Sequence, residues 1–314
     1  MDFVQEVIDL EEHDNKEGGT VTALMKPNPE RYETKKDNDG NIEGYYDTLD
    51  DLFIPIAEVK HMADQMEGTP ITHSPSQIDD IQQYIRKRGP AMKELFNGRF
   101  EDHGFKDVSE EFLENLVEEN SRDFVILFID IAGSTHLNRQ LGDQSYARII
   151  RLFHREIALL VGQFNGHVLK FLGDGLVAYF PSRSYTGRHD NSIDCALCMK
   201  YMVMGGINPV LKTEDLPEIG FRIGIDSGNA EIIPVGASGF KQEVDLIGET
   251  MNLASKIEAQ AENNGIYLGA DAERGLHTQW RKHTEEVKNL EDWDYKKGDN
   301  NSYKLYRYVG MVSG

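Results

Sequence analysis

The chain has little cysteine, no long apolar run and few basic residues for its size. Only two cysteines occur in 314 residues, which excludes a disulfide framework. No run approaches the roughly 18 apolar residues of a membrane-spanning helix. The net charge of −21 argues against a dedicated nucleic-acid binder and against a protein of anionic membrane surfaces. The acidic first residues lack a leader pattern, so we expect a cytoplasmic protein.

The acidic charge is concentrated at one end of the chain. Residues 1–118 hold 28 acidic and 12 basic residues, whereas 119–314 hold 26 and 21. The length also suggests two domains. We therefore expect an acidic N-terminal region, 1–118, and a second domain, 119–314. The acidic surface is either simply solvated or binds an unknown regulator.

The N-terminal region is predicted to be mixed α and β. Residues 38–40 (Asn-Asp-Gly) favour a hairpin turn, because the stretch lacks the Gly and Glu spacing of a calcium loop. Ser76 resembles a helix cap, and Gly-Pro at 89–90 is expected to interrupt that helix. Another cap at Ser109 opens a helix leading into the second domain, as a signalling connector or as plain packing.

The second domain opens with a continuous apolar run, 124–131, typical of a strand buried on both faces. Asp130 near its end is costly there unless it is paired or binds a metal. Gly133, Ser134 and Thr135 follow, and such small residues let backbone N–H groups approach a phosphate at a helix start.

A second carboxylate is expected at a hairpin tip. A long amphipathic helix over 143–164 leads into strands 167–172 and 176–180, joined by a tight Gly-Asp-Gly turn. An aspartate in a turn is usually only a turn residue. Together, however, Asp130 and Asp174 form the carboxylate pair that two-metal phosphoryl chemistry requires.

Further along, residues 221–225 predict a strand, 226–228 a turn, and 229–233 the continuation of the strand. A helix follows from Glu249 onward. Asn252 and Lys256 are four residues apart and so share one face of it.

The chain resembles the class III nucleotidyl cyclases over about residues 121–310. The motifs FIDIAGST, KFLGDG, FRIGIDSG and DLIGETMNLASK carry the resemblance in their order and spacing. It implies an α+β fold with a ferredoxin-like βαββαβ core and a homodimer with its sites at the interface. The implied reaction is attack of the 3′-hydroxyl of a nucleoside triphosphate on its α-phosphate, with loss of pyrophosphate.

The resemblance also implies roles for single residues. Asp130 and Asp174 match the two metal-binding aspartates, which would hold two Mg²⁺ or Mn²⁺ ions per site. Lys170 and Asp245 match the base-selecting pair. Asn252 matches the asparagine that positions the ribose.

Lys256 stands where the family usually has an arginine that stabilises the transition state. A lysine supplies charge but not a planar fork of donors, which favours a slower enzyme or a different geometry. The alternative is an exposed helical lysine. For the lysine that binds the triphosphate, the candidates Lys288, Lys296 and Lys297 stay open.

The hydrogen-bonding groups of Lys170 and Asp245 indicate which base the nucleotide substrate carries. Lys170 only donates and Asp245 only accepts, which fits the N1 and amino group of adenine. Cytosine repeats that pattern and uracil matches it less well, while GTP-selective members usually carry Glu and Cys-type residues here. We therefore expect an adenylate cyclase that makes cyclic AMP.

Two alternatives stay open. The first is a pyrimidine cyclase of an antiphage system. The second is a catalytically degenerate module that binds nucleotide and regulates a partner. A diguanylate cyclase would show a Gly-Gly-[Asp/Glu]-[Asp/Glu]-Phe hairpin, which is absent.

Two minor features complete the expectations. Cys195 and Cys198 form a C-x-x-C pair within an amphipathic helix, and with no second pair in the chain we expect core cysteines. The alternation over 303–309 predicts a terminal strand at a sheet edge.

Overall fold

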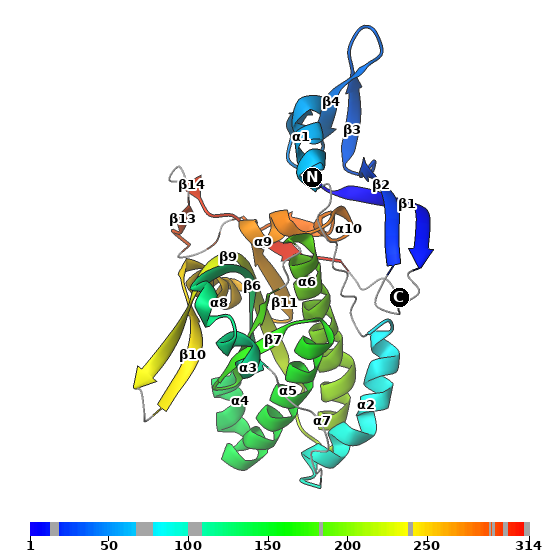
Figure 1. Cartoon of the computed structure of the whole chain (residues 1–314). Coiled ribbons are helices and arrows are strands. Elements are labelled where there is room, and N and C mark those ends of the chain that lie inside the picture. Colours follow the sequence, from blue (N-terminus) through cyan, green and yellow to red (C-terminus); the bar gives the residue numbers. More distant parts are fainter. Residues whose placement is uncertain are drawn as a thin grey trace. The chain divides into compact units, whose positions relative to one another are not determined.

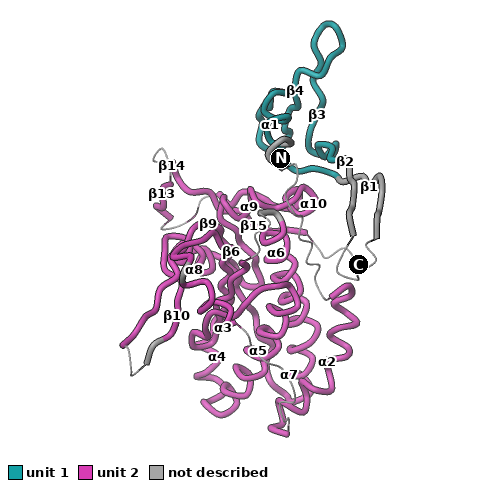
Figure 2. The backbone as a smooth tube through the Cα atoms, viewed as in Figure 1, with its two compact units in different colours: residues 1–73 teal, residues 74–314 magenta. Residues whose placement is uncertain are grey.

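The computed structural model describes residues 1–12, 19–66, 78–99, 109–181, 185–237, 241–288, 290, 293–297 and 301–310. The chain divides into two compact units, residues 1–73 and residues 74–314 (Figure 2). This division differs from the boundary expected between residues 118 and 119. The segment from residue 74 to residue 118 thus belongs to the second unit.

The described part of the first unit contains small antiparallel sheets and one helix. Its elements are β1 (Phe3–Glu12), β2 (Gly19–Pro27), β3 (Tyr32–Lys36), β4 (Ile42–Asp47), β5 (Leu52–Pro55) and α1 (Ile56–Met66). β1 pairs with β2, and β4 lies between β3 and β5. The expected hairpin is confirmed between β3 and β4, where Gly40 has φ 86° and the Asp37 carboxylate accepts hydrogen bonds from the backbone N–H groups of Asp39 and Asn41.

Helix α2 (Ile81–Phe96) is the first described helix of the second unit and packs into its core. The Asp80 side chain caps it, whereas Ser76, the cap expected from the sequence, lies outside the described residues. Pro90 lies inside the helix, so the expected interruption at 89–90 is wrong. Packing overrides the local cost of proline here, because four apolar side chains of α2 are buried: Ile81, Ile85, Met92 and Phe96.

The sheet of the second unit has the strand order β12-β15-β11-β9-β6-β8-β7. β10 pairs with β9 beside it (Figure 1). Its strands are β6 (Ser121–Ala132), β7 (His167–Leu172), β8 (Gly175–Phe180), β9 (Gly220–Ala237), β10 (Lys241–Ile247), β11 (Gly265–Gly269), β12 (Thr284–Glu286) and β15 (Leu305–Tyr308). The short strands β13 (Lys296–Lys297) and β14 (Asn301–Ser302) pair with each other.

Helices connect and cover these strands. They are α3 (Ser109–Glu114), a 3₁₀ turn (Val117–Glu119), α4 (Ser134–Leu141), α5 (Asp143–Gln163), α6 (Tyr185–Tyr201), a π-helical segment (Met202–Ile207), α7 (Asn208–Thr213), α8 (Glu249–Gln260), α9 (Ala270–Gly275) and α10 (Thr278–Arg281). The chain order β6-α5-β7-β8-α6-β9 and the spatial order β9-β6-β8-β7 confirm the ferredoxin-like βαββαβ core. Among the described helices, none is both long and apolar enough to cross a bilayer.

The sheet is buried on both faces, as the apolar run of β6 predicted. Val125, Leu127 and Ile129 pack with the helices α2, α5 and α6. Phe124 and Ile126 point to the opposite face, which α3, β10 and α8 cover. This second face, the α8 face, also carries the site described below.

Cys195 and Cys198 are buried in α6, as expected for core residues. Burial raises the pKa of the Cys198 thiol to about 12, so this sulfur stays protonated at neutral pH.

Two expectations about strands are wrong. Residues 226–228 form no turn, because β9 runs on through them and its residues 220–231 pair continuously with β6. The terminal strand β15 lies between β11 and β12 and is not at the edge. In both cases, pairing with strands distant in sequence overrides the local pattern.

Helix α8 packs directly on β9 at Gly224. A Cβ atom at this position would lie 2.2 Å from the backbone nitrogen of Glu258 and 2.5 Å from the carbonyl oxygen of Ala254. Because both atoms belong to the helix backbone, no rotamer change can relieve the clash. The glycine is therefore required for the distance between α8 and the sheet.

We expect Gly224→Ala to destabilise the protein by about 2–3 kcal/mol, because α8 must move away from β9. Urea unfolding measures this change. Gly89→Ala is the matched control, since a Cβ there has no atom within 4 Å and alanine favours the helix by about 1 kcal/mol or less. Equal unfolding midpoints for Gly224→Ala and the wild type would contradict the packing argument.

Candidate active site

Asp130 and Asp174 meet at one end of the sheet. Asp130 lies near the end of β6, and Asp174 occupies the two-residue turn between β7 and β8. Gly173 begins this turn with φ 61°, a conformation that favours glycine. A Cβ at Gly175 would lie 3.0 Å from Asp130 Oδ1 and 2.4 Å from the carbonyl oxygen of Ile129. Both glycines thus help the two carboxylates to approach each other.

The two acids are partly buried beside each other. The pKa of Asp130 is raised to about 7, first by burial and then by its hydrogen bond with Asp174 and the charge of that residue. Arg222 opposes the shift, with Nη2 3.3 Å from Asp130 Oδ2. Oδ2 of Asp174 is buried without a hydrogen-bond partner. A buried, unpartnered carboxylate oxygen beside a second acid is an arrangement that a cation stabilises.

The donor set fits Mg²⁺ or Mn²⁺. A cavity of about 190 Å³ adjoins Asp130 and Asp174, and Ser255 and Glu258 of α8 also line it. Hard divalent cations bind one or two carboxylates together with waters and phosphate oxygens. Within the described ranges, no cluster of three or more His, Cys, Asp or Glu could hold a metal. The two aspartates would therefore supply the protein ligands, and water and substrate the others.

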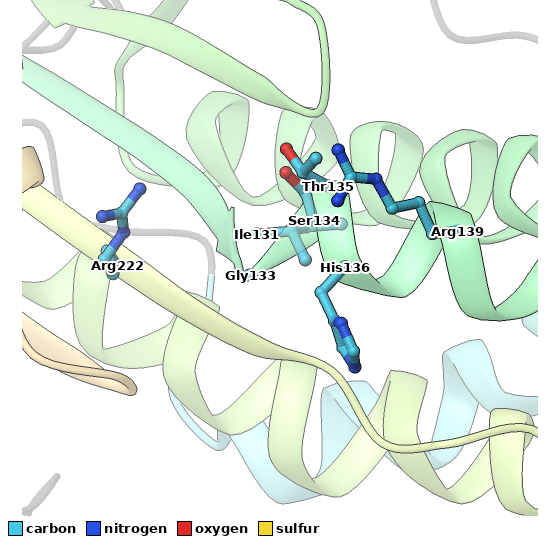
Figure 3. A pocket seen from close by; sticks show the side chains of 7 residues that line it. All are labelled: Ile131, Gly133, Ser134, Thr135, His136, Arg139 and Arg222. Atoms are coloured by element: carbon cyan, nitrogen blue, oxygen red, sulfur yellow. The ribbon is translucent and has the colours of Figure 1, made fainter.

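A second, open pocket of about 490 Å³ surrounds the start of α4 (Figure 3). Gly133 precedes the helix with φ 70°, and Ser134 and Thr135 form its first turn. Arg139 and Arg222 also line the pocket, and Figure 3 shows the guanidinium of Arg139 beside Thr135. Unpaired N–H groups at a helix start and two guanidinium groups favour an anion such as phosphate.

Three charged residues of this region, Arg139, Arg222 and Glu258, were missed by the sequence reasoning. Arg222 lies within the strand motif FRIGI, and Glu258 lies two residues after Lys256. Arg222 Nε is 2.9 Å from Glu258 Oε1. A charged residue inside a buried strand was the available signal for Arg222. For Glu258, the signal in the sequence was its position four residues after the apolar Ala254, on the same face of the helix.

Lys170 and Asp245 are in direct contact, and their role in selecting the base stays a prediction. Lys170 Nζ lies 2.5 Å from Asp245 Oδ2. A β-bulge in β7 makes this possible, because Val168 lies opposite Ala178 and Lys170 opposite Val177. The extra residue turns Lys170 to the α8 face, where β10 places Asp245.

Asn252 and Lys256 are both exposed on α8. The ammonium of Lys256 lies 5.7 Å from the centre of the Tyr295 ring, at cation–π distance. The structure thus places these two residues on the outer side of the helix, while Glu258 faces the sheet.

The three late lysines differ in their surroundings. Lys297 pairs with Asp271 at 2.5 Å and lies over the ring of Tyr303. Lys288 and Lys296 are exposed. That one of these three lysines binds the triphosphate stays a prediction.

Comparison with known families decides the class. The family model of the adenylate and guanylate cyclase catalytic domain matches residues 116–306. The chain belongs to this family. The resemblance drawn from the four motifs is therefore confirmed, and so is the class III cyclase fold.

Relatives of the chain carry names that differ in the base. The chain is 30% identical over 158 residues to a cytidylate cyclase of Escherichia coli, a match that covers 46% of this chain and 33% of the relative. It is 25% identical over 183 residues to a uridylate cyclase of Rhodovulum sp. (strain MB263), covering 55% of this chain and 75% of that one. The chain thus matches only about a third of the length of the first relative.

Solved structures agree on the fold. The guanylyl cyclase Cya2 superposes with a TM-score of 0.53 at 18% identity, over 61% of this chain and 93% of that one. The adenylyl cyclase CyaB from P. aeruginosa gives a TM-score of 0.53 at 18% identity, over 61% and 95%.

The raised pKa of Asp130 predicts a pH-dependent stability of the metal-free protein. Folded Asp130 keeps its proton up to about pH 7, whereas an aspartate of the unfolded chain releases it near 3.8. Rising pH between these values therefore favours the unfolded chain. We expect Asp130→Asn to raise the free energy of unfolding at pH 8 and to change it little at pH 4.

Urea unfolding in the presence of a chelator measures this at both pH values. The control is Asp123→Asn, which alters an exposed aspartate of the same strand. An Asp130→Asn effect of equal size at pH 4 and pH 8 would show that the charge is not the cause.

Proposed function

We propose that the protein converts a nucleoside triphosphate to a 3′,5′-cyclic nucleotide and pyrophosphate. The observation that carries this proposal is the position of two side-chain pairs on the α8 face of the sheet. Asp130 and Asp174 adjoin a cavity lined by α8, and Lys170 contacts Asp245 of β10. One pair suits metal-bound phosphate and the other suits the edge of a base.

Each group has a part in the reaction. The 3′-oxygen bonds to the α-phosphorus, the bond to the bridging oxygen of the β-phosphate breaks, and pyrophosphate leaves with that electron pair. The proton of the 3′-hydroxyl goes to solvent. Divalent ions held by Asp130 and Asp174 would neutralise charge on the phosphate oxygens. The chain itself binds the phosphates through the α4 N-terminus, Arg139 and Arg222.

On α8, Asn252 would orient the ribose and Lys256 would stabilise charge at the α-phosphate. Since a lysine cannot form the two parallel hydrogen bonds of an arginine, we expect slower turnover than an arginine at this position would give.

We propose a homodimer as the active form. Phe171 and Leu172, at the end of the edge strand β7 beside the site, are 51% and 47% exposed. A second chain would cover such apolar side chains. It would also give the outward-facing Asn252 and Lys256 a substrate to contact, so that two sites form across one symmetric interface.

The base follows from the Lys170–Asp245 pair. A donor beside an acceptor suits a ring nitrogen next to an amino group, which adenine and cytosine both offer. ATP is the substrate expected from the residues. CTP is the second candidate, favoured by the relatives named cytidylate cyclase in Escherichia coli and in Staphylococcus aureus.

Purified protein should make a cyclic nucleotide from ATP or CTP, and at least about tenfold more slowly from GTP or UTP. Each triphosphate is supplied separately with Mg²⁺ and with Mn²⁺, and mass spectrometry identifies the product. Cyclic AMP supports the first candidate and cyclic CMP the second. If the protein binds a nucleotide but forms no product, the proposal of a cyclase is overturned and a regulatory nucleotide-binding module remains.

Asp130→Asn should reduce turnover by at least about 100-fold while leaving the dimer intact, because it removes a metal ligand. Product formation and size-exclusion chromatography measure the two properties. Asp123→Asn is the control and should keep wild-type turnover. An active Asp130→Asn variant would exclude the two-metal mechanism.

The double variant Lys170→Glu with Asp245→Cys should shift the base preference toward GTP. The reason is that these substitutions exchange the donor and acceptor that face the base. The ratio of kcat/KM values for the four triphosphates measures the shift, and Lys93→Glu, an exposed charge reversal on α2, is the control. An unchanged preference would exclude this pair from base recognition.

A further inference from the structure

Arg222 lies between two carboxylates that come from different elements. Its Nη2 is 3.3 Å from Asp130 Oδ2 on β6, and its Nε is 2.9 Å from Glu258 Oε1 on α8. The second pair is an ion pair without hydrogen-bond alignment. The same guanidinium lines the pocket at the start of α4, where Figure 3 shows it across from Ser134 and Thr135.

The two carboxylates are not equivalent. Under the proposed function, Asp130 is a metal ligand, and cations bound there compete with Arg222 for its oxygens. Cations near Asp130 also repel a guanidinium. Glu258 is not one of the proposed metal ligands, so its carboxyl group stays beside Arg222, and its side chain is only 12% exposed.

The backbone holds Glu258 in place. The close packing of α8 on β9 is at Gly224, two residues after Arg222, and the helix atom nearest to a Cβ at Gly224 would be the nitrogen of Glu258 itself. Arg222 and Glu258 therefore project from two backbones in van der Waals contact. A carboxylate at Nε leaves both terminal nitrogens of the guanidinium for a planar contact with phosphate.

We propose that Glu258 is a positioning residue that holds Arg222 toward the phosphate pocket when metal ions occupy Asp130. This inference rests on the proposed function. It assigns Glu258 an effect on phosphate binding in addition to its packing in the fold.

The test is a double-mutant cycle of Glu258→Gln and Arg222→Gln in the full-length protein. Glu258→Gln should raise the KM for the triphosphate, and the Kd for inorganic tripolyphosphate in Mg²⁺, about tenfold, with kcat changed less than the KM. Added to Arg222→Gln, it should have little further effect, because its action passes through Arg222.

Glu262→Gln is the matched control. It removes an exposed carboxylate just beyond the end of α8 that pairs with Arg307, and it should leave both constants unchanged. Glu258→Asp shortens the side chain but keeps the charge, and it should recover part of the affinity. If Glu258→Gln does not fold, the Glu258→Asp variant tests the inference in its place. We expect its affinity to lie between that of the wild type and a tenfold weaker value.

Tripolyphosphate binding separates the two proposals. A tenfold weaker Kd for Glu258→Gln supports the inference even if the wild type forms no cyclic product. A wild type that forms product, together with Glu258 variants that have unchanged KM and Kd, overturns the inference and leaves the cyclase intact. Equal effects of Glu258→Gln with and without Arg222 would also overturn it.

Discussion

The contact between helix α8 and strand β9 at Gly224 is the constraint on which the candidate site depends. With no side chain between the two backbones, the helix approaches the sheet closely enough for Glu258 to reach Arg222. The same contact gives the helix a fixed inner and outer side. Its outer side presents Asn252 and Lys256, whereas its inner side closes the cavity beside the two aspartates. Gly224, in the middle of a strand, therefore determines both how the core packs and where the residues of the candidate site lie.

The charges around Asp130 explain why this region lowers the stability of the fold and yet suits the binding of a cation. Arg222 pairs with both Asp130 and Glu258, Asp174 lies beside Asp130, and burial deprives these acids of the water that would stabilise their charges. In the absence of metal the strain appears as a raised pKa of Asp130. A divalent cation would relieve it, because the deficit is one of positive charge. The residues that lower the stability of the fold are therefore the residues that would bind the proposed substrate and its metal ions.

Much of the fold could be predicted from local pattern. The apolar run of β6, the amphipathic helix α5 and the Gly-Asp-Gly turn each have a strong period or turn signal, and the structure contains all three. The failures share one cause. Pro90 continues a helix, residues 226–228 continue a strand, and β15 lies inside the sheet, because in each case contacts with distant segments outweigh the local preference.

By itself, the sequence determined the kinds of residues available for chemistry and their order along the chain. It placed Asp130 at a strand end and Asp174 in a turn, because strand and turn signals are local. Only the tertiary structure decided which residues meet. Lys170 reaches Asp245 through a bulge, although they are 75 positions apart, and Arg222 joins Glu258 through the packing of a helix on a strand. Such contacts depend on register and on distances between backbones, which hydrogen bonds and packing across the whole sheet set together.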